Sequence, residues 1–168
     1  MGAFTYPRSE PGSAGHLDLV EQLNAHAFAL RRELAGLPDA TLSARPAEGE
    51  WSIKDTLGHL CDVGRISHQR LFMMVRLEEP RLAGYDTDEM ARASNAQAAK
   101  IEDLLAEFAT QRAATVELLA ELVHWNWARQ GRHEVMGRIS IRQQVELWLA
   151  HEENHLAQIR SLKEQAAG

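Results

Sequence analysis

Apolar residues recur at helical spacing along almost the whole chain, and no stretch alternates with the period of two that a half-buried β-strand needs. Four amphipathic segments stand out, at about residues 16–34, 52–79, 98–123 and 140–162. Such helices are stable in water only when their apolar faces pack together. We therefore predict an all-α fold, a four-helix bundle with long connections between its helices.

Residues with capping chemistry mark where two of these helices begin. Ser52 is followed three residues later by Asp55, which approximates a capping box with Asp in place of Glu. Ser140 and Gln143 form the standard pair at the start of the last helix. Pro80 ends the second helix, because its ring cannot continue the hydrogen-bonded turn.

The first helix and the connections carry further expectations. The residues expected on the inner side of the first helix are Leu17, Val20, Ala27, Phe28 and Leu34. Residues 37–51, which hold two prolines, and residues 124–138 are predicted to be loops. Residues 81–94 are predicted to be a long connection with one short helical turn.

The length and net charge of the chain constrain its domain organisation and the kinds of partner that it can have. A chain of 168 residues suits a single domain, which we place at residues 16–168 after a flexible leader at residues 1–15. The leader has no apolar run, so we expect no signal peptide, no membrane association and a cytoplasmic protein. The net charge is −6 and no helix face is basic, which argues against a nucleic-acid partner.

The segment His151-Glu-Glu-Asn-His155 fits the zinc-protease pattern H-E-x-x-H, in which Glu152 would activate water. The extended protease pattern requires glycine and histidine at the positions of Gln158 and Ser161. No histidine follows His155 to supply a third ligand from downstream. The chain is therefore not predicted to be a protease of this class.

Two histidines four residues apart lie on one side of a helix, where they can share one metal ion. His151 and His155 fall on the flank of the apolar face of the last helix, and His59 lies at the edge of the apolar face of the second helix. Each could also be a hydrogen-bonded structural histidine. Together, three neutral imidazoles would leave a coordination position open for water or substrate. The other histidines are expected to be solvated or in loops.

Three ordered blocks give the chain a resemblance to the DinB-like (DinB/YfiT-like) superfamily of four-helix bundles. They are EWSIKDTLGHLCD, GYDTDEMARAS with Phe108 and Arg112, and GRHEVMGRISIRQQVELWLAHEENHLAQI. By motif, the resemblance implies that His59, His151 and His155 bind a divalent metal ion, most commonly nickel or zinc, often in a homodimer. It also implies a thiol S-transferase that uses a low-molecular-weight thiol such as mycothiol or bacillithiol, or a metal-dependent hydrolase.

Charged residues near these histidines have alternative roles. Glu152 falls within the apolar face of the last helix, where an unpaired carboxylate is costly. It could orient a ligand or transfer a proton in catalysis, or it could form an ion pair with Arg112. Arg112 could instead bind a substrate carboxylate. Asp62 and Asp55 could each accept the spare ring N–H of His59, be solvated, or, for Asp55, cap the helix.

The single cysteine, Cys61, excludes an internal disulfide and a cysteine-rich zinc site, and we expect it to be a packed or surface thiol and not a nucleophile. The sequence therefore predicts a metal-dependent enzyme acting on a small molecule, first as a thiol S-transferase and alternatively as a hydrolase. A metal-binding or ligand-binding bundle without turnover is the remaining alternative. A transferase would need an added thiol and a hydrolase would not.

Overall fold

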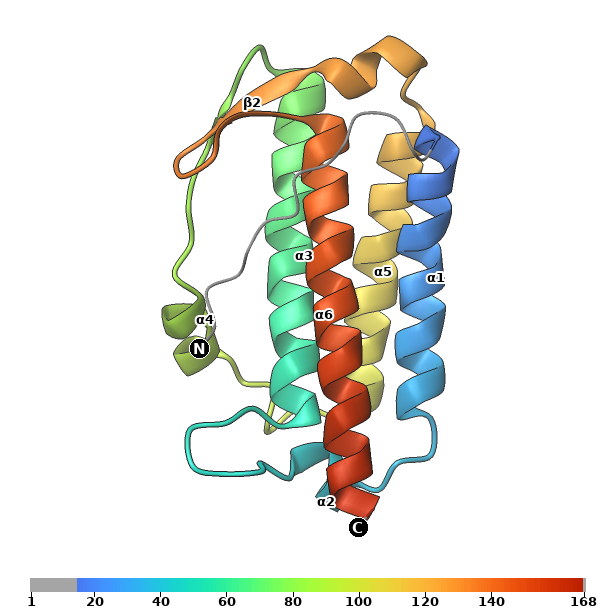
Figure 1. The fold of residues 1–168 in the computed structure, drawn as a ribbon, viewed down its shortest axis with the longest axis vertical. Helices are drawn as coiled ribbons and strands as arrows, with labels where there is room; N and C mark the ends of the chain where they lie inside the picture. Colours follow the sequence, from blue (N-terminus) through green and yellow to red (C-terminus); the bar gives the residue numbers. More distant parts are fainter. Residues whose placement is uncertain (1–14, 168) are drawn as a thin grey trace.

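A computed structural model describes residues 15–167, so almost all of the expected leader at residues 1–15 lies outside the described residues. Four long helices form the bundle, α1 (His16–Leu34), α3 (Ile53–Arg76), α5 (Ile101–Ala120) and α6 (Ile141–Ala167) (Figure 1). Each helix packs against two others, so that α1, α5, α3 and α6 close a ring. This confirms the predicted fold class.

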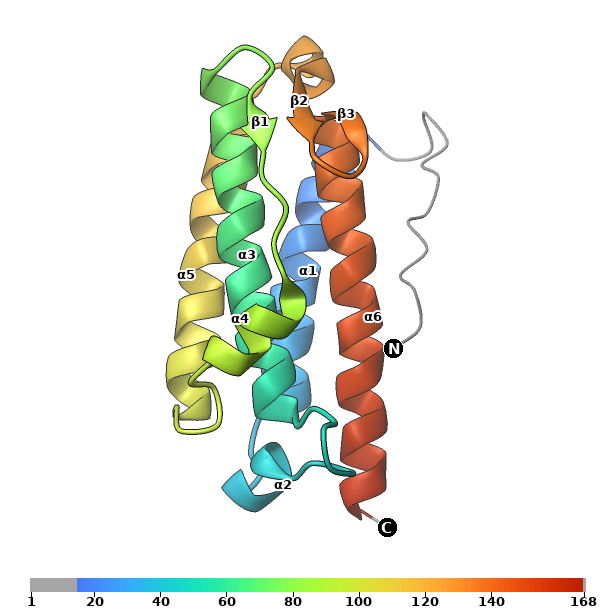
Figure 2. The same ribbon diagram turned by 90° about the vertical axis from the view of Figure 1, so that its left-hand side faces the viewer.

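The helices do not simply alternate in direction. In Figure 1, α1 and α6 run downward while α3 and α5 run upward, so the two consecutive helices α3 and α5 are parallel. The connection at residues 77–100 must therefore return along the length of the bundle before α5 can begin. It contains strand β1 (Arg81–Leu82) and the short helix α4 (Thr87–Ala93), and Figure 2 shows it running beside α3.

A three-stranded sheet at one end of the bundle corrects the prediction that the chain has no strands. β2 (Gln130–His133) and β3 (Gly137–Ser140) form an antiparallel hairpin, and β1 adds to β2 in parallel. The segment predicted to be a loop at residues 124–138 thus holds β2 and part of β3, after a 3₁₀ turn. Apolar alternation is absent because the inward residues of β2 are Gly131 and His133. Gly137, with φ of 73°, is the one local signal for this hairpin.

The capping predictions are confirmed. The Ser52 side chain accepts a hydrogen bond from the Asp55 amide, and the Asp55 carboxylate accepts one from the Ser52 amide. Ser140 and Gln143 exchange the same pair of bonds before α6. The predicted loop at residues 37–51 contains one short helix, α2 (Asp39–Ser43).

The predicted inner face of α1 is partly wrong. Leu34 is buried as expected, but Leu17 and Phe28 are 77% and 75% exposed. The core instead receives Leu19 and Leu23, and further along also Leu30. Large apolar side chains occur on both sides of this helix, so their spacing alone does not show which side is buried. The contacts of α1 with α5 and α6 determine the buried side.

A polar layer divides the core into two apolar clusters. One cluster lies toward the sheet and includes Leu23, Met74 and Val145, and the other lies toward α2 and includes Leu57 and Ile159. Between them on α1, α5 and α6 stand His26, Arg112 and Glu152, of which Arg112 and Glu152 are fully buried. In residues 15–167, no helix has the length and apolar character needed to cross a membrane.

Because the buried side of α1 carries Leu23 and not Leu17, the same leucine-to-alanine substitution should affect stability unequally at these two positions. Leu23→Ala should lower the free energy of unfolding by about 2–5 kcal/mol, because it removes a fully buried side chain. Leu17→Ala, the matched control on the same helix, should change it by less than about 0.5 kcal/mol. Urea unfolding of both variants measures the difference, and equal losses would contradict the observed orientation of α1.

Candidate metal centre

Three histidines from the two neighbouring helices α3 and α6 converge on one point. The Nε2 atom of His151 lies 3.1 Å from Nε2 of His59 and 3.2 Å from Nε2 of His155. His59 is buried in α3, two turns after the Ser52 cap, and the other two are half-buried one turn apart on α6. The structure therefore brings together all three histidines that the sequence predicted as ligands.

The donor set fits a divalent metal ion. Two imidazole nitrogens on one ion, each about 2.0–2.1 Å from it, lie about 2.9 Å apart at a right angle and about 3.3 Å apart in a tetrahedron. The two observed Nε2 separations, 3.1 and 3.2 Å, fall between these values. One ligand atom from each of the three histidines lies within 4.8 Å of the others. Among the described residues, this is the one group with such a geometry.

The protonation states of the three imidazoles are also those that metal binding requires. Nδ1 of His155 is 2.8 Å from the Gln158 side-chain oxygen and donates its proton to it, which leaves Nε2 with a free lone pair. Burial, with a smaller effect of the neighbouring imidazoles, lowers the pKa of His59 to about 4 and that of His151 to about 3. Burial also lowers the pKa of His155. All three are neutral near pH 7, the form that binds metal.

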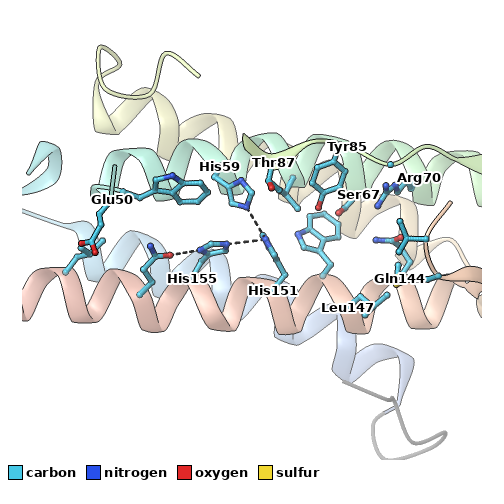
Figure 3. A pocket seen from close by; sticks show the side chains of 18 of the residues that line it. Glu50, His59, Ser67, Arg70, Tyr85, Thr87, Gln144, Leu147, His151 and His155 are labelled. Atoms are coloured by element: carbon cyan, nitrogen blue, oxygen red, sulfur yellow. Dashed lines mark hydrogen bonds between the residues drawn. The ribbon is translucent and has the colours of Figure 1, made fainter. Parts of the chain in front are cut away.

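A cavity of about 1030 Å³ opens directly beside the three histidines. It lies between α3 and α6 and is walled by the loop before α3, the connection after β1 and the hairpin (Figure 3). Trp51 covers the ligand side, with its ring centroid 4.8 Å from that of His59 and 6.0 Å from that of His155. The convergence point is therefore shielded on one side and accessible to a small molecule on another.

Glu152 lies in the core and does not line this cavity. One carboxylate oxygen accepts a hydrogen bond from Arg112, forming the predicted ion pair, and the other is 3.0 Å from Nδ1 of His26. The Arg112 guanidinium also stacks over the Trp148 ring at 4.7 Å. Arg112 is thus committed to the core and is not placed to bind a substrate carboxylate in the cavity.

The two aspartates that flank His59 have other partners. Asp55 caps α3 and accepts two hydrogen bonds from Arg45. Asp62 pairs with Arg65 at 3.0 Å. Among the described residues, Nδ1 of His59 has no hydrogen-bond partner, so neither aspartate orients this ring as the sequence had allowed.

Two further histidines correct the expectation of solvated side chains. His26 is mostly buried and contacts Glu152, while His68 is 3.0 Å from the Thr115 hydroxyl. His133, which was expected in a loop, is buried in β2 and lines the cavity. Cys61 is buried, its thiol donates to the Leu104 carbonyl, and burial raises its pKa to about 12, as expected for a packed thiol.

Comparison with known proteins agrees with the motif resemblance. The family model of the DinB superfamily matches residues 22–159. YuaE of Bacillus subtilis (strain 168) is 26% identical over 145 residues, which cover 79% of this chain and 90% of that protein. The Oceanobacillus iheyensis protein named "Putative metal-dependent hydrolase OB0413" is 25% identical over 141 residues, covering 84% of this chain and 81% of that protein.

Solved structures share the architecture. YfiT from Bacillus subtilis, described as "a probable metal-dependent hydrolase with an unusual four-helix bundle topology", superposes with a TM-score of 0.86 at 20% identity, covering 96% of this chain and 93% of that one. TT2238, described as a four-helix bundle protein, superposes with a TM-score of 0.66 at 22% identity, covering 88% and 99% of the two chains. At these identities the likeness shows the fold.

The lowered pKa values predict how the metal-free protein responds to acid. His59 is neutral when folded down to about pH 4 but is protonated below about pH 6.5 when unfolded, so the unfolded chain binds more protons in this window. Its contribution to stability, complete above pH 6.5, should fall by about 1.4 kcal/mol per pH unit as the pH drops toward 4.

Chelator-treated protein and the variant His59→Gln can be unfolded with urea across this pH range. The variant should lose stability less steeply, by about one proton, because glutamine does not titrate. Equal slopes for the two proteins would show that His59 is not held neutral by burial.

Proposed function

The chain belongs to the DinB superfamily, and from this premise we propose that it is a divalent-metal-dependent enzyme that acts on a small molecule. His59, His151 and His155 would hold the ion, with nickel or zinc as the expected metals. The single observation that carries the proposal is the cavity of about 1030 Å³ beside the three converging imidazoles. Three protein ligands facing an open space are the arrangement of catalytic sites, whereas structural zinc sites are closed by four.

The chemistry supplied by such an ion, when bound, is a lowered pKa for a thiol or water at the open position, which yields a nucleophile near neutral pH. Residues of this chain orient the side chains around the open coordination position. Gln158 fixes the His155 ring so that its Nε2 faces the site, and Trp51 packs against the rings of His59 and His155. Glu152 and Arg112 support α6 from the core side without contacting the cavity.

Thiol S-transfer is the reaction that we place first. A thiol bound to such an ion would release its proton to solvent because the ion lowers its pKa, whereas attack by water is commonly assisted by a carboxylate that accepts its proton. Among the described residues that line the cavity, Glu50 is the one carboxylate, and it lies at one end of the lining in Figure 3. A low-molecular-weight thiol as co-substrate, with an electrophile bound in the same cavity, is consistent with this lining.

Hydrolysis is the second candidate. It is favoured by the names of similar proteins, namely the O. iheyensis protein and YfiT, both described as metal-dependent hydrolases with the qualifiers quoted above. Glu50 or a second water would then have to accept the proton of the attacking water. A bundle that only binds metal would not require the open cavity, whereas a ligand-binding bundle without turnover would use it.

Metal content tests the site itself. The parent protein should take up about one nickel or zinc ion per chain, and His59→Ala and His155→Ala should each lose most of it, because two imidazoles remain. His68→Ala, a half-buried histidine on α3 outside the cluster, is the matched control and should keep its metal. Elemental analysis after incubation with each metal gives the ratio. A parent that stays metal-free would reject the proposal.

Added thiol separates the two reactions. With metal bound, the protein should accelerate displacement of chloride from chlorodinitrobenzene by mycothiol or bacillithiol, and the acceleration should vanish in His155→Ala. Release of nitrophenol from nitrophenyl acetate without thiol measures hydrolysis. Thiol-independent turnover that needs the three histidines would replace the transferase with the hydrolase. No turnover with metal bound would favour a binding protein.

A further inference from the structure

The cavity continues well beyond the three histidines toward the sheet. On α3, Ser67 and Arg70 line it eight and eleven residues after His59, which is about 12 Å and about 16 Å along the helix axis. On α6, Gln144 lines it seven residues before His151, about 10 Å along the axis. The spacings of Arg70 and Gln144 are close to whole turns, so these two residues share one face with the candidate ligands, and Ser67 lies about 80° around α3 from His59. We call this sheet-side part of the cavity, made by Ser67, Arg70, His133 and Gln144, the distal subsite.

The two ends of the cavity carry opposite charges. Arg70 stands at the distal subsite and Glu50 at the other end, with the histidines between them (Figure 3). Arg70 is only 7% exposed. One of its Nη atoms donates to the Ala83 carbonyl, and its guanidinium lies 5.2 Å from the centre of the Tyr85 ring. These contacts hold a positive charge in a fixed orientation at the cavity wall.

His133 adds a neutral donor at the same end. Its Nδ1 accepts hydrogen bonds from the backbone amides of Val135 and Met136, so in the neutral ring the proton is on Nε2. Burial lowers the pKa of His133, and the charge of Arg70 lowers it further. Arg70 is therefore the positively charged member of the distal subsite near pH 7, and the other three members are neutral hydrogen-bonding groups.

Gln144 and Ser67 supply two further buried polar side chains at this end of the cavity. Gln144 is 4% exposed and Ser67 is 3% exposed. Among the described residues, the Gln144 side-chain oxygen has no hydrogen-bond partner. An amide oxygen accepts hydrogen bonds and does not donate them, so the Gln144 amide nitrogen and the Ser67 hydroxyl are the groups that can donate to a ligand carboxylate.

We propose that the distal subsite binds the carboxylate of an elongated substrate whose reacting group lies about 10–16 Å away along the helix axes, at the three histidines. This inference rests on the proposed function and names its substrate class. One fixed guanidinium with neutral donors matches a singly charged planar anion, whereas a doubly charged phosphate would need a second cation. Glu50 repels an anion from the opposite end, which sets the orientation.

Octanoate tests the subsite without any reaction and without metal. Isothermal titration calorimetry on the full chain, before and after chelator treatment, should show octanoate binding roughly tenfold or more tightly than octanol. Arg70→Gln should remove this preference for the carboxylate and leave the affinity for octanol unchanged. Arg76→Gln, an exposed arginine on the same helix, is the matched control and should keep it.

Gln144→Leu provides a second variant that leaves the contact between Arg70 and Ala83 in place. It should weaken octanoate binding several-fold without lowering the unfolding temperature, because it removes a buried oxygen that has no partner among the described residues. Equal binding of octanoate and octanol, or equal preference in the parent and both folded variants, would overturn the proposal. Because the calorimetry with octanoate needs no metal, its result is independent of whether the three histidines bind an ion.

Ligands of different length test the predicted distance between the distal subsite and the three histidines. In protein loaded with cobalt, mercaptooctanoate should bind roughly tenfold more tightly than mercaptoacetate, judged by the sulfur-to-cobalt absorption band, because only the longer acid spans both positions. The advantage should be lost in Arg70→Gln while cobalt content stays the same. An advantage that persists in Arg70→Gln would show that the longer chain, and not its carboxylate, is recognised.

Discussion

A buried carboxylate constrains the middle of this bundle. Glu152 is fully buried and is held between Arg112 of α5 and His26 of α1. Removing one partner from a buried ion pair typically costs about 3–5 kcal/mol, since it strands the other charge. Any sliding of α6 along its neighbours would separate these groups, so the polar layer fixes the register of three helices. The apolar clusters above and below it pack around that register.

The same register places the candidate metal ligands. His151 precedes Glu152 by one residue, about 100° around the helix, so α6 directs a carboxylate into the core and an imidazole toward α3. His155 follows one turn later and completes the pair that faces His59. The H-E-x-x-H motif therefore contains residues of two kinds on one helix, namely imidazoles that face α3 and a carboxylate that faces the core. The glutamate is a core ion-pair partner and not the water-activating base of a protease.

Local features of the fold could be predicted from sequence, and non-local ones could not. The caps at Ser52 and Ser140 and the four-residue spacing of His151 and His155 depend on neighbours within one or two turns. The burial of His26 depends on a partner 126 residues away, and a helix with apolar side chains on two faces does not reveal its phase. The hairpin was missed because its inward positions hold Gly131 and His133, which give no apolar alternation.

The parallel arrangement of α3 and α5 explains why a cavity exists beside the histidines. A short turn cannot join parallel helices, so the connection must travel back along the bundle, and it does so beside α3, where Gly84, Tyr85 and Thr87 line the cavity. On the α3 and α6 sides, the cavity is lined by imidazoles, a serine and a glutamine together with apolar side chains such as Val63 and Leu147. The long connection, a topological necessity, thus also forms a wall of the site.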